Sequence, residues 1–191
     1  MDERQLNENE SLELISRMIR NTQQNLEKES GIPFLVWGYI TVFVSLSVWM
    51  ILSKTDDYLW HLLWFLIPAI GWPLMHFLIR KKEKEVKTYV DKVISYVWIS
   101  FGIAALLTSI TAIFFWKIPV LFIILLLIST GTVITGMIIR FKIIITVGFI
   151  GMLLSFICLF VPGLNQILIF AGAFLVMMII PGHILNAKGR R

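Results

Sequence analysis

The sequence predicts an all-α fold: a polytopic membrane protein built as a six-helix transmembrane bundle with an N-terminal cytoplasmic amphipathic helix. Apolar runs of about 20 residues follow one another from Pro33 to Leu185, and each is long enough for a helix to cross a bilayer core of roughly 30 Å. The chain is 58% hydrophobic and only 15% charged, unlike a soluble domain. The runs do not alternate polar and apolar residues, so helices are expected rather than a barrel.

The segment 1–31 is expected to form the amphipathic helix. An apolar stripe recurs along it at helical spacing at Leu12, Ile15, Ile19 and Leu26, and Leu14 and Met18 widen it. Ser30 and Gly31, followed by Pro33, predict that this helix stops before the first span. The opposite face is less basic than that of a typical lipid-surface helix. Two interpretations therefore stay open: the stripe packs on a cytoplasmic partner protein or a second copy, or it lies on membrane lipids.

The transmembrane domain is expected to cover residues 32–187. Its six spans are predicted at 33–53, 59–79, 93–116, 118–139, 143–161 and 166–185. The third and fourth spans touch at Lys117-Ile118-Pro119, where a tight turn is expected because a single helix of that length would outrun any bilayer. The last residues, 188–191, form a basic cytoplasmic tail.

Basic residues predict the orientation of the spans. Of the 17 Lys and Arg residues, all but Lys54 and Lys117 fall in the N-terminal segment, the second and fourth loops and the C-terminal tail. Because cytoplasmic loops accumulate Lys and Arg, both termini are predicted to be cytoplasmic. Minimal loops and a Lys- and Ile-rich composition indicate the cytoplasmic (inner) membrane of a bacterium. Nucleic-acid binding is not expected, since the basic residues lie at membrane edges rather than in a recognisable domain.

Acidic residues predict which chemistries are absent. Asp91 is the last of them, so no carboxylate side chain occurs from Lys92 to Arg191. Pumps and cation-coupled transporters usually carry protons and bind ions on intramembrane Asp or Glu, so carboxylate-based coupling is not expected. The sequence contains no HExxH, GxSxG or P-loop motif, and its single cysteine, Cys158, offers no thiolate metal cluster. We therefore expect no enzyme activity, no cofactor and no metal.

One small constellation is a candidate ligand site. The second span contains Trp72, Pro73 and His76, and the sixth contains Pro181 and His183. Proline removes a helix hydrogen bond and leaves a carbonyl free, and two histidines at similar depth could share a ligand if the two spans were neighbours. The competing interpretation is structural, because proline kinks are common in membrane helices and histidines near an interface usually hydrogen-bond locally.

Small and hydroxylated residues predict close contacts between helices. They are Ser129, Thr132 and Gly136 in the fourth span, Gly148 and Gly151 in the fifth and Gly172 in the sixth. Such faces let helices approach closely, within the bundle or across a homo-oligomer. The alternative is a polar lining for a permeation path.

Two functional hypotheses follow from these features. The first is a non-catalytic regulatory, assembly or structural membrane component that acts through its N-terminal helix and its small-residue faces. The alternative is a small-solute or lipid-binding transporter, with an inward-facing site between the kinked second and sixth spans. In both hypotheses membrane lipids surround the bundle.

Overall fold

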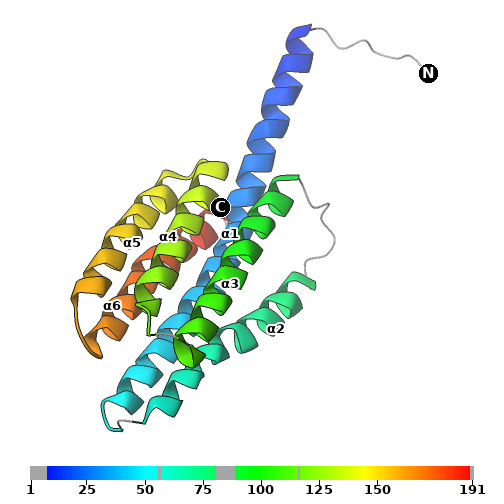
Figure 1. Cartoon of the computed structure of the whole chain (residues 1–191). Coiled ribbons are helices and arrows are strands. Elements are labelled where there is room, and N and C mark those ends of the chain that lie inside the picture. The colour runs from blue at the N-terminus through cyan, green and yellow to red at the C-terminus, as the bar shows by residue number, and fades with distance from the viewer. Residues whose placement is uncertain (1–7, 56, 81–88, 116, 190–191) are drawn as a thin grey trace.

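Helices make up nearly all of the chain (Figure 1). The computed structural model describes residues 8–55, 57–80, 89–115 and 117–189; it is 90% helix and, over these residues, has no strand. Six of its helices are long and apolar enough to cross a membrane, as predicted. In chain order the elements are α1 (Glu8–Leu52), the 3-10 helix η1 (Tyr58–Phe65), α2 (Leu66–Arg80), α3 (Tyr89–Phe114), α4 (Val120–Ile138), α5 (Lys142–Phe160), α6 (Asn165–Phe174), the π-helix η2 (Leu175–Ile179) and α7 (Ile180–Gly189).

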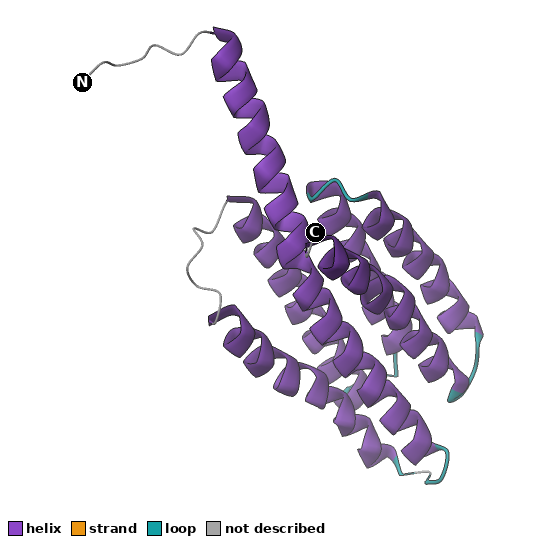
Figure 2. Cartoon of the chain, turned by 180° about the vertical axis from the view of Figure 1, so that it is seen from behind, coloured by secondary structure: helices purple, strands orange, loops and turns teal. Residues whose placement is uncertain are grey.

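The six apolar helices coincide with the predicted spans to within a few residues at each end. Their limits are Gly31–Leu52, Leu59–Leu78, Tyr89–Phe114, Val120–Ile138, Lys142–Phe160 and Asn165–Ala187. The turn predicted at Lys117-Ile118-Pro119 is confirmed, because α3 ends at Phe114 and the N–H of Val120 donates to the carbonyl of Ile118 at 2.7 Å. Figure 2 shows the same helices from behind.

The predicted stop between the N-terminal helix and the first span is wrong. The helix α1 runs through Gly31 and Pro33 without interruption and is 45 residues long. Gly31 serves as a packing position: a Cβ there would lie 3.2 Å from both the backbone nitrogen of Asn186 and the carbonyl oxygen of Gly182. The contact with α7 holds this turn in helical geometry. Pro33 costs the helix one backbone hydrogen bond but does not end it.

Two spans depart from regular α-helix next to a proline. The second begins as η1, where the carboxylate of Asp57 accepts the N–H of Leu59 at 3.0 Å. The last contains η2 directly before Pro181, which has no N–H to offer the carbonyl of Met177 and whose ring crowds it. The chain widens locally into π geometry, so that the N–H of Ile180 donates to the carbonyl five residues back. Proline therefore sets the local geometry of the last span.

Four helical units form the packed part of the molecule, and two helices flank it. The spanning half of α1 packs along the last span, α6–η2–α7, while α4 pairs with α5 and both contact α6 (Figure 1). The helix α2 packs mainly on α1 and η1, and α3 mainly on α4. Fully buried apolar side chains lie where the four units meet; they include Val48, Leu125, Ile144, Phe170 and Met177. No described residue of α3 is fully buried.

Candidate functional site

The most conspicuous feature outside the bundle is the N-terminal half of α1. The part of this helix that precedes the first span, residues 8–30, is roughly 35 Å long at the α-helical rise, and most of it extends beyond the other helices (Figures 1 and 2). Leu12, the first residue of the predicted stripe, is 63% exposed. The other three, Ile15, Ile19 and Leu26, lie in the same continuous helix, and their side chains are outside the described ones. This half of α1 therefore presents a helical surface that the bundle leaves uncovered at Leu12.

The small-residue positions of α4 and α5 face each other at close range. A Cβ at Gly136 would lie 2.8 Å from the backbone nitrogen of Ile145, and one at Gly148 would lie 2.9 Å from the backbone nitrogen of Val133. Backbone atoms cannot move aside as a flexible side chain can. Ser129 and Thr132 are buried on the same helix, so α4 and α5 pack backbone to backbone here.

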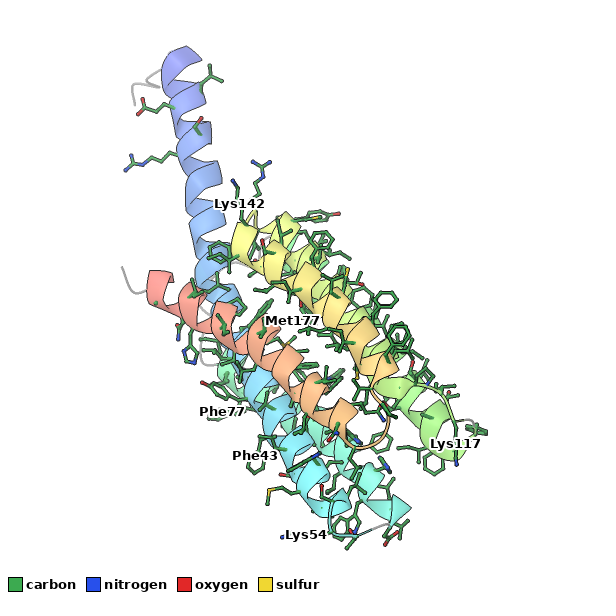
Figure 3. All side chains as sticks on the ribbon, turned by 90° about the vertical axis from the view of Figure 1, so that its left-hand side faces the viewer. Phe43, Lys54, Phe77, Lys117, Lys142 and Met177 are labelled. Atoms are coloured by element: carbon green, nitrogen blue, oxygen red, sulfur yellow. The ribbon has the colours of Figure 1, made fainter. Side chains whose placement is uncertain are left out.

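Gly151 lies where α5 meets the last span. A Cβ at this position would overlap the Sδ atom of Met177, and the Oγ atom of Ser129 lies 3.1 Å from the same sulfur. Figure 3 places Met177 on the side of the last span that faces α5. Gly172 differs from the other glycines of the predicted set, since it is exposed and a Cβ there would touch nothing within 4 Å. Its role on an oligomer face stays a prediction.

Sequence reasoning missed a second close crossing, between α1 and the last span. A Cβ at Gly38 would lie 2.8 Å from Cγ1 of Ile179, and one at Gly182 would lie 2.9 Å from Cγ of Leu35. Gly31 takes part in the same crossing. Gly31 and Gly38 are seven residues apart and so share one face of α1, which is the signal that could have revealed this contact.

Buried hydroxyl groups are satisfied by their own helices. Ser45, Ser129 and Thr135 each donate to the carbonyl four residues earlier, at 2.6–2.8 Å. The hydroxyl of Thr135 also accepts the indole N–H of Trp98 at 3.1 Å, which ties α3 to α4. Over the described part of the chain, no buried side-chain nitrogen or oxygen lacks a hydrogen-bond partner. These groups stabilise packing and leave no lone polar atom to hold a ligand.

The predicted ligand residues are distributed over two places. Trp72, Pro73 and His76 are exposed on α2. In the last span Pro181 is buried, and His183 is exposed and hydrogen-bonded, its Nε2 atom lying 2.7 Å from the hydroxyl of Tyr39 on α1.

The second and last spans meet through a ring contact between Trp64 of η1 and Phe170 of α6, with centroids 5.5 Å apart. This contact lies toward the opposite end of both spans from His76 and His183. In the described residues, no group of three or more His, Cys, Asp or Glu side chains could hold a metal ion. A shared ligand site at the two histidines stays a prediction.

Lysine side chains lie at both ends of the bundle. Lys142 lies at the end from which α1 projects, and Lys54 and Lys117 lie at the other end (Figure 3). The C-terminal end of α7 is on the same side as the projecting helix (Figure 1). No protein-family model, curated protein or solved structure was found to match this chain.

Proposed function

We propose that the chain is a multi-pass protein of the bacterial cytoplasmic membrane and a non-catalytic assembly or regulatory component that acts through the projecting half of α1. The membrane part of the proposal is supported by the outer surface of the bundle. Large apolar side chains lie uncovered on three different helices, among them Phe43 (73% exposed), Phe77 (67%) and Leu153 (67%). In water such a surface would be strongly unfavourable, whereas lipid tails would cover it.

Both termini are proposed to be cytoplasmic. An even number of spans returns the chain to its starting side. Only Lys54 and Lys117 among the basic residues fall in the loops of the opposite side, which matches the bias of cytoplasmic loops toward Lys and Arg. The projecting half of α1 would then stand in the cytoplasm.

The observation that carries the functional proposal is the continuity of α1. A helix that lies on lipid must turn into the plane of the membrane, whereas α1 continues outward from the bundle without a break (Figures 1 and 2). Its apolar stripe is thereby lifted away from the bilayer. Protein is then the remaining apolar surface that the stripe can bind, which favours a partner-binding role over a lipid-surface role.

The interior of the bundle supports a structural role for the spans. The helices are packed directly against one another. Backbones are in close contact at Gly136 and Gly148, and the side chain of Met177 fills the space beside Gly151. Hydroxyl groups that would line a permeation path instead bond to their own helices, as Ser129 and Thr135 do. These contacts favour the assembly hypothesis over the transporter hypothesis.

Site-specific photo-crosslinking in living bacteria tests the proposal. A photoreactive amino acid replaces Ile19 on the stripe or, as the matched control, Arg17 on the exposed polar face of the same helix. Protein adducts from position 19 and few from position 17 are the expected result. Lipid adducts from position 19, or equal protein adducts from both positions, would contradict the proposed role.

Topology is tested separately with single cysteines in a Cys158→Ser background. A membrane-impermeant maleimide should label Thr55→Cys in intact cells and should label Ser16→Cys only after the membrane is opened, since both positions are exposed. The reverse order of labelling would overturn the orientation.

A further inference from the structure

We infer that the occupant of the apolar stripe on α1 is a second copy of this chain, so that two α1 helices associate in parallel as a two-stranded coiled coil. This inference rests on the proposed cytoplasmic, protein-binding role of the projecting helix. It identifies the partner, which that role leaves open.

The spacing of the stripe is that of a coiled-coil seam. Its four members fall at intervals of three, four and seven residues: Leu12, Ile15, Ile19 and Leu26. In a heptad these are positions a, d, a and a, with Thr22 at the intervening d. The a positions keep a strict seven-residue repeat, which is typical of helix pairing, and Leu14 and Met18 widen the apolar face around the seam.

The charges of the helix are arranged to permit self-association. Between Leu12 and Leu26 the charged residues are Glu13, Arg17 and Arg20, and all three fall at the outer b and f positions. The positions that flank the seam carry only uncharged side chains, namely Ser16, Met18, Gln23 and Asn25. Two identical helices therefore meet without like charges opposing each other, whereas a partner of complementary charge would find nothing beside the seam to pair with. Glu8 and Glu29 fall at the d positions on either side of this stretch, so the uncharged seam lies between them.

Membrane geometry makes the parallel arrangement the natural one. Because α1 is continuous from Glu8 to Leu52, two copies in one membrane would project their helices in the same direction and in the same register. A two-fold axis along the membrane normal relates them, which is the commonest symmetry of homo-oligomers.

The spanning half of the same helix also has an uncovered face, on the outside of the bundle. The exposed residues of its spanning half recur at intervals of four, three and four: Tyr39 (51%), Phe43 (73%), Leu46 (42%) and Met50 (54%). In the heptad that begins at Leu12, Phe43 and Met50 fall at d positions and Tyr39 and Leu46 at g positions, so a left-handed supercoil is needed to bring both faces to one partner. Figure 3 shows Phe43 on the outside of the bundle.

Tyr39 brings no unmet polar group to this surface, because its hydroxyl is hydrogen-bonded to His183 of the same chain. The exposed strip of the spanning half can therefore pack against the equivalent strip of a second α1 without burying an unpaired hydroxyl group. One contact along α1 would join the cytoplasmic seam to the membrane-embedded strip.

Disulfide and bismaleimide crosslinking of the full chain in native membranes tests the inference. In the Cys158→Ser background, Ile15→Cys and Ile19→Cys on the seam are compared with Arg17→Cys on the outer face. Phe43→Cys is compared with Leu153→Cys, which is 67% exposed on α5. We expect a species of twice the 22.0 kDa chain mass from positions 15, 19 and 43, at least ten-fold more abundant than from positions 17 and 153.

Three results would overturn the inference, and they separate it from the proposed function. Seam cysteines that crosslink to a different protein alone would refute the second copy and leave the partner-binding role intact. Seam cysteines that yield no protein adduct would refute the second copy, and photo-crosslinking from position 19, which needs no thiol on the partner, then decides the partner-binding role. A dimer that forms through position 153 and not through α1 would refute the coiled coil.

A double substitution supplies a measurement that does not depend on cysteine chemistry. Ile15→Asp with Ile19→Asp places charge on the seam and should halve the protein mass found by light scattering in detergent. Glu13→Gln with Arg17→Gln alters the outer face of the same helix and should leave the mass unchanged. A dimer that survives the aspartate pair would contradict the inference.

Discussion

The spanning half of α1, Gly31–Leu52, and the helix α3 have the same mean hydropathy, 2.0, but they occupy different places in the fold. The first is flanked by the second span on one side and the last span on the other, and residues such as Val44 and Val48 are buried. The helix α3 packs mainly on α4 and has no fully buried residue. Hydropathy alone therefore does not decide which helix is central; positions that allow close contact do.

Glycine marks the difference between the two regions. Gly31 and Gly38 on α1 lie against backbone or buried side chains of the last span, whereas a Cβ at Gly102 on α3 would touch nothing within 4 Å. In lipid, apolar side chains gain little by leaving the solvent, so tight packing and hydrogen bonds hold helices together. The helices rich in such contacts form the core, and α3 is held mostly by its contact with α4.

The largest expected effect compares one leucine from each region. Leu125 on α4 is fully buried, and Leu125→Ala should lower the free energy of unfolding in detergent by about 3 kcal/mol, because it removes packed methyl groups and leaves a cavity. Leu107→Ala on α3, where the side chain is 58% exposed, should change it by less than about 0.5 kcal/mol. Thermal unfolding followed by circular dichroism measures both. Equal losses would show that α3 is as tightly packed as α4.

The next effect concerns the contact of α4 with α5. Gly148→Ala forces a methyl group against the backbone of Val133 and should destabilise the protein by about 2 kcal/mol. Gly102→Ala is the matched control on α3, where the added methyl group meets no neighbour and improves helix propensity by up to about 1 kcal/mol. The two variants should therefore shift the melting temperature in opposite directions. A rise in melting temperature for Gly148→Ala would contradict the close contact.

A smaller effect is expected at the crossing of α1 with α7. Gly182→Ala brings a methyl group close to Leu35, whose side chain can partly move aside, so we expect a loss of about 1 kcal/mol. Hydrogen exchange should then increase in α7, because this helix is held mainly by α1 and η2. Gly172→Ala in α6, where the new Cβ meets nothing, should leave exchange in α7 unchanged.

The smallest effect sharpens the description of α3. Trp98→Phe removes the hydrogen bond to the hydroxyl of Thr135 and should cost about 0.6 kcal/mol, the average for such bonds between membrane helices. Trp72→Phe on α2, where the indole is 60% exposed, is the control and should cost less. In a double-mutant cycle, Trp98→Phe should cost much less when Thr135→Val is already present, and full additivity of the two substitutions would exclude the bond as the cause.

Local rules failed where the last span packs against its neighbours. Ser30-Gly31 before Pro33 is a sound stop signal by itself, but Gly31 is needed for the approach of α7 and the helix continues. Pro181 was expected to free a carbonyl for a ligand, and it instead coincides with a π segment whose Met177 is buried beside Gly151. In both cases the residue type is compatible with two local structures, and the contact with a neighbouring helix decides which of them forms.

The candidate partner surface depends less on tertiary contacts than the candidate ligand site does. A seven-residue repeat of apolar residues needs no tertiary contact to be recognised, so the stripe from Leu12 to Leu26 is visible in the sequence. The ligand hypothesis needed the second and sixth spans to meet near His76 and His183, and pairing of spans leaves no local pattern. In the structure those spans meet at the ring contact of Trp64 with Phe170, and His183 is hydrogen-bonded to Tyr39.

By itself the sequence determined the number, length and helical nature of the spans and the distribution of basic residues between the two sides. These depend on run lengths and local charge, since each helix satisfies its own backbone hydrogen bonds. Only the tertiary structure decided that α1 is one uninterrupted helix that packs along the last span, that α3 has no fully buried residue and that the last span carries a π segment. Lipid tails are as apolar as a protein core, so an apolar run does not record which of its faces another helix will cover.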